Sequence, residues 1–216
     1  MYPVLWLGND FYLPSYFTVI ALAYCLAIIY LYFRTLKYQQ SLLVAMDLAI
    51  IIMIGGFLGA RLFHVIYEAP GYYFENPLDI FKVWQGGFVF YGGAFFAITL
   101  SLFYLKRKSQ DILTWLDIFA PIVPVTYFWG RFATLLSGSG YGKATTLPWG
   151  IVYPPGTEAP SGVALHPTPI YAMIFEASAF LIIYFSERGN FFKVRKKKGD
   201  LFFLMIICHG FGRLIV

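Results

Sequence analysis

Long runs of apolar residues constrain this chain more than any other feature of its sequence. A helix needs roughly 20 such residues to cross about 30 Å of hydrocarbon, and a backbone in lipid must satisfy its own hydrogen bonds. A membrane barrel would need strictly alternating segments of about 10 residues, which are absent. Of the 216 residues, 59% are hydrophobic and only 12% are charged, against about 25% charged in soluble domains. The sequence therefore predicts an all-α, polytopic transmembrane helical bundle.

The expected spans number about six and reach the last residue of the chain. We place them within a single integral membrane domain, residues 1–216, at residues 15–33, 42–66, 86–105, 112–129, 167–186 and 201–216. The last run would form about 24 Å of helix at 1.5 Å per residue, which is shorter than the hydrocarbon core. We therefore expect the natural sequence to continue past Val216, where a seventh span would lie.

Basic residues gather in three loops that would all lie on one side of the membrane. These loops, at residues 34–41, 106–111 and 187–200, hold 11 of the 16 Lys and Arg residues: Arg34, Lys37, Lys106, Arg107, Lys108, Arg188, Lys193, Arg195, Lys196, Lys197 and Lys198. Because positive loops stay in the cytoplasm, the N-terminus is expected outside. The run from Lys193 to Lys198 has an alternative interpretation as a lipid or nucleic-acid patch. Topology is the simpler explanation, so no nucleic-acid partner is expected.

Several kinds of chemistry have no support in the sequence. The two cysteines, Cys25 and Cys208, lie in apolar runs and are expected to be buried free thiols. No HExxH, CxxC or phosphate-binding P-loop motif occurs, so neither a metal nor a cofactor is expected. The first residues lack the basic stretch, short apolar core and cleavage site of a signal peptide.

Three arginines, Arg61, Arg131 and Arg213, lie near the expected outer ends of three different helices. Ionisable groups at membrane depth are costly and usually face a cavity or a partner. Since a guanidinium can bind two phosphate oxygens at once, the three arginines suggest an anion site beside the outer leaflet. The alternative is that each arginine snorkels to the interface or pairs with an acidic residue, namely Asp47, Asp117 or Glu176.

Glycines form a second signal. Gly55, Gly56 and Gly59, together with Gly86, Gly87, Gly92 and Gly93, allow close helix packing or leave room for a ligand. The segment 137–142 (Ser-Gly-Ser-Gly-Tyr-Gly) is expected to be a loop or broken helix that lines protein or a polar cavity. His166 precedes the fifth span, whereas His64 and His209 lie inside apolar runs and are expected to be structural.

These motifs, taken in order, resemble the prolipoprotein diacylglyceryl transferase family. The stretches that match are Gly59-Ala60-Arg61-Leu62-Phe63, Trp84-Gln85-Gly86-Gly87, Phe90-Tyr91-Gly92-Gly93, Gly130-Arg131 with Tyr141-Gly142, His166-Pro167-Thr168 with Tyr171, and Gly212-Arg213. The resemblance covers residues 16–213 in the family's order and spacing. A single motif is weakly specific, whereas the ordered set is fairly specific.

The resemblance implies a bacterial inner-membrane enzyme of lipoprotein biosynthesis. Its members move the diacylglyceryl group of phosphatidylglycerol onto the lipobox cysteine of a prolipoprotein signal peptide, which forms a thioether and releases glycerol 1-phosphate. By match to family positions, the catalytic residues would be Arg131, Arg213 and Tyr91. The substrate-binding residues would be Arg61, Tyr16, Gly92, Gly93, Thr134, Ser139, Gly142 and His166.

Some polar positions of the family pattern are altered. Where the family has Gly-Asn, then an asparagine and a glutamate, this chain has Ala133, Thr134, Ser137 and Ser139, and Pro169 and Ala172 replace a glutamine and a glutamate. Two interpretations therefore stay open: an active transferase, or a diverged member that binds phospholipid or lipoprotein without catalysis. A small-anion transporter is a more distant third, because no inverted repeat of broken helices is evident.

Overall fold

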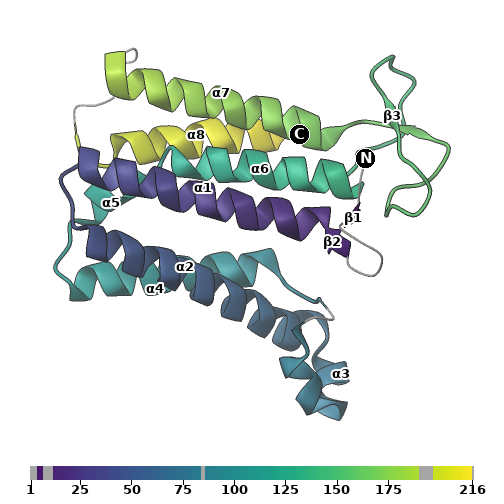
Figure 1. The fold of residues 1–216 in the computed structure, drawn as a ribbon, viewed down its shortest axis with the longest axis horizontal. Coiled ribbons are helices and arrows are strands. Elements are labelled where there is room, and N and C mark those ends of the chain that lie inside the picture. Colours follow the sequence, from purple (N-terminus) through teal and green to yellow (C-terminus); the bar gives the residue numbers. More distant parts are fainter. Residues whose placement is uncertain (1–3, 7–11, 84–85, 190–196, 216) are drawn as a thin grey trace. The chain divides into compact units, whose positions relative to one another are not determined.

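The computed structural model of the chain describes residues 4–6, 12–83, 86–189 and 197–215 (Figure 1). Trp84 and Gln85 of the third-span motif, and Lys193, Arg195 and Lys196 of the basic loop, lie outside the described residues. The described chain is mainly helical, which confirms the predicted all-α membrane bundle. Its helices are α1 (Ser15–Lys37), α2 (Leu42–Phe63), α3 (Pro70–Glu75), α4 (Phe90–Arg107), α5 (Ile112–Phe119), α6 (Ile122–Ser137), α7 (Thr168–Gly189) and α8 (Asp200–Ile215).

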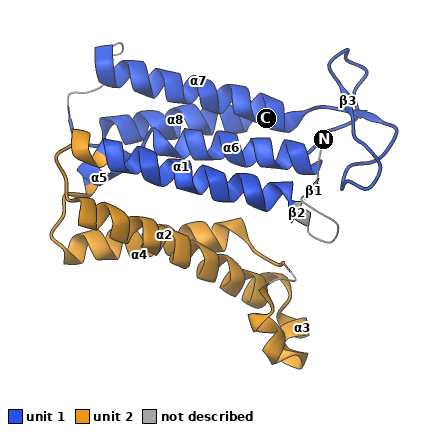
Figure 2. Cartoon of the chain, in the orientation of Figure 1, with its two compact units in different colours: residues 1–34, 113–216 blue, residues 35–112 orange. Residues whose placement is uncertain are grey.

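Shorter elements connect these helices. A π-helix, η1 (His64–Glu68), continues α2, and a 3-10 helix, η2 (Pro77–Phe81), follows α3. Two antiparallel strand pairs complete the described structure, β1 (Val4–Trp6) with β2 (Tyr12–Pro14) and β3 (Ile151–Val152) with β4 (Ala164–Leu165). The chain divides into two compact units, which Figure 2 colours separately: unit 1 comprises Met1–Arg34 and Leu113–Val216, and unit 2 comprises Thr35–Ile112.

Four helical segments are long and apolar enough to cross a membrane: Ser15–Lys37, Leu42–Glu68, Ile112–Ser137 and Thr168–Gly189. They coincide with the first, second, fourth and fifth expected spans. Helices α4 and α8 occupy the other two positions and contain 18 and 16 residues, or about 27 and 24 Å of helix. The presence of helices at all six positions is confirmed, whereas a crossing by α4 and by α8 stays a prediction.

The third span begins later than expected. Its helix was predicted from residue 86, but α4 starts at Phe90. Gly86 and Gly87 have φ angles of 81° and 79°, in the left-handed region that a right-handed helix excludes. The two glycines thus end a loop instead of opening the helix.

The fourth span is broken into α5 and α6 at Ala120 and Pro121. A proline has no N–H to donate and its ring clashes with the carbonyl four residues earlier, here that of Asp117. The carbonyls of Asp117 and Ile118 are therefore free to accept hydrogen bonds from Arg34, whose Nη2 and Nε lie 2.7 and 3.3 Å from them. The break in one helix thus binds the end of α1.

The same end of unit 1 is held by buried charges. Arg34 forms an ion pair with Glu187 at the end of α7, and both side chains are almost fully buried. The carboxylate of Asp117 accepts hydrogen bonds from the backbone N–H groups of Gly199 (2.8 Å) and Phe202 (3.1 Å) at the start of α8. A carboxylate at a helix N-terminus satisfies free N–H groups and favours the helix dipole.

Within unit 1, α7 packs against both α6 and α8, and α6 and α8 run in the same direction (Figure 1). Their core is a cluster of four buried residues from α7, α8 and the α5–α6 junction: Ala120, Ile183, Leu201 and Met205. The parallel course of α6 and α8 matters for the site. If one residue of α6 contacts one of α8, residues the same number of positions further along each helix lie at the same height along the helix axes.

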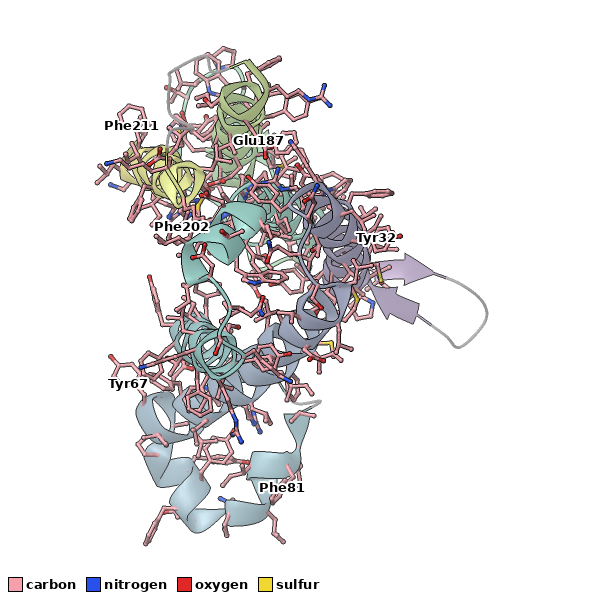
Figure 3. The ribbon with its side chains drawn as sticks, turned by 90° about the vertical axis from the view of Figure 1, so that its left-hand side faces the viewer. Tyr32, Tyr67, Phe81, Glu187, Phe202 and Phe211 are labelled. Carbon is pink, nitrogen blue, oxygen red and sulfur yellow. The ribbon has the colours of Figure 1, made fainter. Side chains whose placement is uncertain are left out.

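Large apolar side chains cover much of the helix surface, as expected for contact with lipid. Tyr32, Tyr67, Phe81 and Phe211 are exposed and stand away from the helices (Figure 3). Cys25 is also exposed on α1, and Cys208 is half-buried. The expectation of two buried thiols is therefore wrong for Cys25, because an apolar run in a membrane protein also supplies surface.

Candidate active site

Arg61, near the end of α2, is engaged by the loop before α4. Its Nε donates to the carbonyl of Ile80 at 3.0 Å, its Nη2 to that of Asp79 at 2.8 Å, and its Nη1 to those of Gly86 and Gly87. The side chain is buried. Since carbonyls occupy all three nitrogens, Arg61 fixes the loop, and its expected contact with phosphate stays a prediction.

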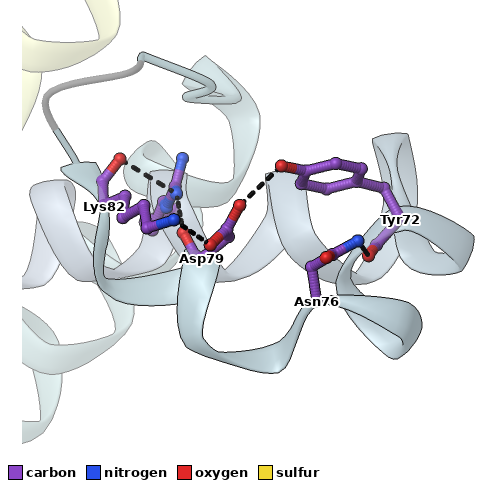
Figure 4. A network of polar contacts seen from close by, with 5 residues as sticks. Tyr72, Asn76, Asp79 and Lys82 are labelled. Atoms are coloured by element: carbon purple, nitrogen blue, oxygen red, sulfur yellow. Dashed lines mark hydrogen bonds and ion pairs between the residues drawn. The ribbon is translucent and has the colours of Figure 1, made fainter.

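Aromatic and ionic contacts hold the same loop. The Arg61 guanidinium lies 5.3 Å from the ring centre of Tyr73 and 5.8 Å from that of Phe88, within the range of cation–π attraction. Asp79 accepts a hydrogen bond from the Tyr72 hydroxyl at 2.6 Å and pairs with Lys82 at 2.5 Å (Figure 4).

These polar contacts shift the pKa values of the groups involved. The hydrogen bond from Lys82, followed by that from Tyr72, lowers the pKa of Asp79. The same contacts raise the pKa of Lys82 and that of Tyr72, in each case chiefly through the hydrogen bond to Asp79. All three shifts favour an ionised Asp79, a charged Lys82 and a neutral Tyr72 near neutral pH, the states in which these contacts form.

Gly92 and Gly93 are buried where α4 meets α2. A Cβ atom on Gly92 would lie 2.3 Å from the Cβ of Phe63, and one on Gly93 would lie 2.7 Å from the carbonyl oxygen of Gly56. A side chain at either position would thus push the two helices apart. The structure supplies a packing reason for these glycines, and their expected contact with substrate stays a prediction.

Tyr91 and Tyr16 both lie near helix starts with their side chains exposed. Tyr91 is in the first turn of α4, and its side chain is 78% exposed. Tyr16 is in the first turn of α1 and makes an edge-to-face contact with Phe17. Either hydroxyl is available to a ligand. The predicted roles of Tyr91 and Tyr16 stay predictions.

Arg131 lies in the last two turns of α6, where Tyr127 contacts it from one turn earlier. Its Nη2 is 2.5 Å from the Tyr127 hydroxyl, and its guanidinium carbon is 4.9 Å from the ring centre. Among the described residues, Nη2 alone forms a side-chain hydrogen bond. The Nε and Nη1 donors of Arg131 therefore remain for another group, in contrast to those of Arg61.

The glycine turn that was expected after Arg131 adjoins it. Helix α6 ends at Gly138, whose φ of 74° places it in the left-handed region. An added Cβ on Gly140 would lie 3.8 Å from Nη1 of Arg131 and 3.6 Å from the Cβ of Thr134. The hydroxyls of Ser137 and Ser139 are 2.8 Å apart. The structure thus brings Arg131 and Thr134 to the same turn that carries Ser139.

Gly142 and His166, two of the expected substrate-binding residues, also lie together. The N–H of Gly142 donates to the carbonyl of His166 at 2.9 Å, and an added Cβ would lie 2.7 Å from the methyl group of Thr168. The His166 Nδ1 is 3.1 Å from the Tyr171 hydroxyl, which accepts a hydrogen bond from Trp149 at 2.7 Å. Trp149 was not among the predicted residues, because a tryptophan in a loop carries no motif by itself.

Arg213 lies in the last turn of α8 and is exposed. No residue in the described part of the chain forms a hydrogen bond or an ion pair with its guanidinium. One turn earlier on the same helix, His209 pairs with Glu176 of α7 at 2.6 Å and packs against the ring of Tyr127. Sequence reasoning missed this pair, although the four-residue steps from Tyr127 to Arg131 and from His209 to Arg213 are visible.

The acidic residues that might have paired with the three arginines have other partners. Asp47 accepts a hydrogen bond from Tyr104, Asp117 binds the start of α8, and Glu176 pairs with His209. Among the described residues, Asp47, Asp117 and Glu176 therefore form no ion pair with Arg61, Arg131 or Arg213.

The fold and these arginines define a helical membrane protein in which Arg131 and Arg213 keep donors for a ligand. The sequence model of the family described as "Prolipoprotein diacylglyceryl transferase" matches residues 3–216. The chain belongs to this family and is a membrane transferase.

Several bacterial relatives carry the name phosphatidylglycerol–prolipoprotein diacylglyceryl transferase. The chain is 35% identical to that of Clostridium tetani, over 100% of this chain and 84% of the relative. It is 31% identical to that of a Wolbachia strain of Drosophila simulans, over 91% and 74% of the two chains. It is also 31% identical to that of Geobacter sulfurreducens, over 79% and 62%. These names support the transferase interpretation, and none of them favours a non-catalytic relative.

Proposed function

We propose that this protein transfers the diacylglyceryl group of phosphatidylglycerol to the lipobox cysteine of a prolipoprotein. The observation that carries the proposal is the state of Arg131, whose Nε–H, Nη1–H and second Nη2–H groups have no hydrogen-bond partner among the described residues. A planar guanidinium with two adjacent donors suits a phosphate oxygen pair. Family membership supplies the lipid and the acceptor that such a site would serve.

The reaction is a displacement at the glyceryl carbon that bears the phosphate. The thiol loses its proton, because the thiolate is the nucleophile. The sulfur then forms a bond to this carbon as the carbon–oxygen bond breaks, and the electron pair leaves with the phosphate as glycerol 1-phosphate. The phosphate gains negative charge during this step, so fixed positive charge beside it stabilises the transition state.

Each site residue expected from the sequence has a role in this proposal. Arg131 and Arg213 stabilise the leaving phosphate, and Tyr91 orients the head group or relays the thiol proton. Thr134 and Ser139, at the end of α6 near Arg131, contribute hydroxyl groups to head-group binding, and Gly142 and His166 contribute backbone and imidazole groups. By their match to the family, Arg61, Gly92, Gly93 and Tyr16 are also proposed to contribute to substrate binding.

The assay that tests the proposal uses phosphatidylglycerol labelled in the glyceryl carbons of its diacylglyceryl group and a synthetic lipobox peptide. We expect the label to move to the peptide in a bond that resists alkaline hydrolysis of esters, with equimolar release of glycerol 1-phosphate. A peptide with serine in place of the cysteine is the matched control and should stay unlabelled. If the protein retains phosphatidylglycerol but never labels the cysteine peptide, the transferase proposal fails.

The proposed location is the bacterial cytoplasmic membrane with the N-terminus outside. The support is the basic loops, whose Lys and Arg residues all lie within the described residues except Lys193, Arg195 and Lys196. A Lys197→Cys probe in a chain without Cys25 and Cys208 should react with a membrane-impermeant reagent only after the cells are opened. Efficient labelling in intact cells would overturn this orientation.

A further inference from the structure

A buried pair of ionisable residues lies beside Arg131 and has no assigned role. His209 Nδ1 on α8 is 2.6 Å from Oε1 of Glu176 on α7, and the Glu176 side chain is only 3% exposed. The second carboxylate oxygen of Glu176 is buried and has no hydrogen-bond partner among the described residues. Removing a carboxylate from water is costly unless it is paired, so Glu176 depends on His209.

Tyr127 connects this pair to the arginine. The rings of His209 and Tyr127 meet edge to face, with centres 4.9 Å apart and planes at 81°. On its other side, Tyr127 contacts Arg131 through both its hydroxyl and its ring. The chain of contacts therefore runs from Glu176 through His209 and Tyr127 to the guanidinium of Arg131, across three helices of unit 1.

Helix geometry places the second arginine at the same level. Arg131 follows Tyr127 by four residues on α6, and Arg213 follows His209 by four residues on α8. Residues four apart share one face of a helix and are separated by about 6 Å along its axis. Because α6 and α8 run in the same direction (Figure 1) and Tyr127 meets His209, both arginines lie one turn beyond this contact.

We propose that His209 and Glu176 form a protonatable pair that positions Tyr127 and Arg131 and sets the charge beneath the two arginines. His209 is thus a positioning residue for the phosphate site, and this inference rests on the proposed transferase function. With a neutral imidazole, the two guanidinium groups and the carboxylate leave a single net positive charge. A proton on His209 adds a second positive charge beside a site for anionic lipid.

The ionisable groups around His209 come from all three helices. His209 contacts Tyr127 on α6 and Glu176 on α7. Arg131 lies beyond Tyr127, and Cys208 and Arg213 are neighbours of His209 along α8. A proton gained by the pair adds a positive charge beside the site for anionic lipid, so the KM for phosphatidylglycerol is expected to depend on pH through this pair.

The test measures kcat and KM for phosphatidylglycerol between pH 5.5 and 8.5 in the wild type, His209→Gln, Glu176→Gln and the double variant. We expect each single variant to lose about tenfold in kcat/KM, which corresponds to about 1.4 kcal/mol. The double variant should lose no more than the worse single variant, because the two residues act as one unit. The pH dependence of KM should disappear in His209→Gln.

Glu68→Gln is the matched control. Glu68 pairs with His64 at 2.5 Å, as Glu176 does with His209, but its side chain is 58% exposed and it lies in unit 2. This variant should keep both the activity and the pH profile of the wild type. If His209→Gln keeps the wild-type pH dependence and KM, the inference is wrong, whereas an inactive wild type would refute the proposed function itself.

A milder variant keeps the inference testable if His209→Gln or Glu176→Gln fails to fold. Tyr127→Phe keeps the ring against His209 and removes only the hydroxyl that meets Arg131. It should raise the KM for phosphatidylglycerol severalfold while its thermal midpoint stays close to that of the wild type. An unchanged KM in this folded variant would refute the chain of contacts.

Discussion

Replacing Arg131 by lysine separates the shape of the guanidinium from its charge. The Tyr127 hydroxyl accepts one N–H of Nη2 of Arg131, which leaves the other Nη2–H, both Nη1–H groups and Nε–H, and two neighbouring N–H groups can bind a phosphate from one side. Lysine keeps the positive charge but presents it as a point on a flexible stem, so it cannot bind two oxygens in a fixed orientation. The variant also loses the planar contact with the ring of Tyr127.

The size of the effect follows from the contact that is lost. One charge-assisted hydrogen bond contributes about 1.5–3 kcal/mol, and each 1.36 kcal/mol in the barrier changes the rate tenfold. We therefore expect Arg131→Lys to lower kcat/KM by roughly 10- to 150-fold. The measurement is the transfer of labelled diacylglycerol to a lipobox peptide at several concentrations of phosphatidylglycerol.

The chain offers a closely matched control for this variant. Arg188 on α7 stacks on Tyr184, four residues earlier, with its guanidinium carbon 4.5 Å from the ring centre. Arg188→Lys thus changes the same kind of arginine–tyrosine contact at the expected cytoplasmic end, and it should keep wild-type kinetics. If Arg131→Lys retains full activity, or if both variants lose activity equally, a phosphate contact by the Arg131 fork is refuted.

Three other predictions concern unit 2. Tyr91→Phe should lower kcat about 2- to 12-fold in the transfer assay, since it removes one hydrogen bond of about 0.5–1.5 kcal/mol, and an unchanged kcat would refute the role. Gly59→Ala should lower the thermal midpoint by an amount equivalent to about 1–3 kcal/mol, because its Cβ would lie 2.6 Å from the carbonyl oxygen of Gly92; a midpoint equal to that of the wild type would contradict this. The pKa of Asp79 is lowered, so its contribution to the stability of the loop is full above pH 3.8 and is lost as the pH falls through the lowered pKa. The pKa of Lys82 is raised, so its contribution is full below pH 10.5 and is lost as the pH rises through the raised pKa. Hydrogen exchange in residues 70–82 should therefore show constant protection between about pH 5 and 9, and Asp79→Asn should lose it throughout; equal protection in both proteins would refute the ion pair.

The positions of the helices could be predicted from the sequence because their cause is local. A run of apolar residues in lipid has to satisfy its own backbone, whatever surrounds it. Their ends depended on single residues, such as the left-handed Gly86 and Gly87 before α4 and the proline after Ala120. Such residues are visible in the sequence. Whether a proline breaks a helix, or a glycine pair moves the start of a helix to a later residue, depends on which partners bind the backbone groups that lose their helical hydrogen bonds.

The candidate site was predicted only where its residues are near one another in the chain. Arg131, Thr134 and Ser139 lie on one helix end and its turn, so the motif already placed them together. His209 and Glu176 are 33 residues apart, and their contact requires the packing of α7 against α8. An isolated histidine in an apolar run gives no sign of such a partner.

The different states of the arginines follow from the helix breaks beside them. Carbonyls freed by the break at Pro121 bind Arg34, and carbonyls of the loop before α4 bind Arg61. The end of α6 is closed differently: the N–H of Ser139 donates to the carbonyl of Thr134 at 3.0 Å, and that of Gly138 to Leu135 at 3.4 Å.

This closure is a Schellman motif, which satisfies the last carbonyls of a helix with its own backbone. The carbonyls of Thr134 and Leu135 therefore do not need the guanidinium of Arg131, although the turn lies near it. A glycine that closes its own helix end thus leaves a neighbouring arginine to bind a ligand, whereas an open break uses the arginine to complete the fold. Gly138→Ala should consequently reduce both stability and transfer. Stability should fall because the φ of 74° is strained for alanine. Transfer should fall because the freed carbonyls would compete with phosphate for Arg131. If Gly138→Ala lowers only the thermal midpoint and leaves the KM for phosphatidylglycerol unchanged, the turn has no such role.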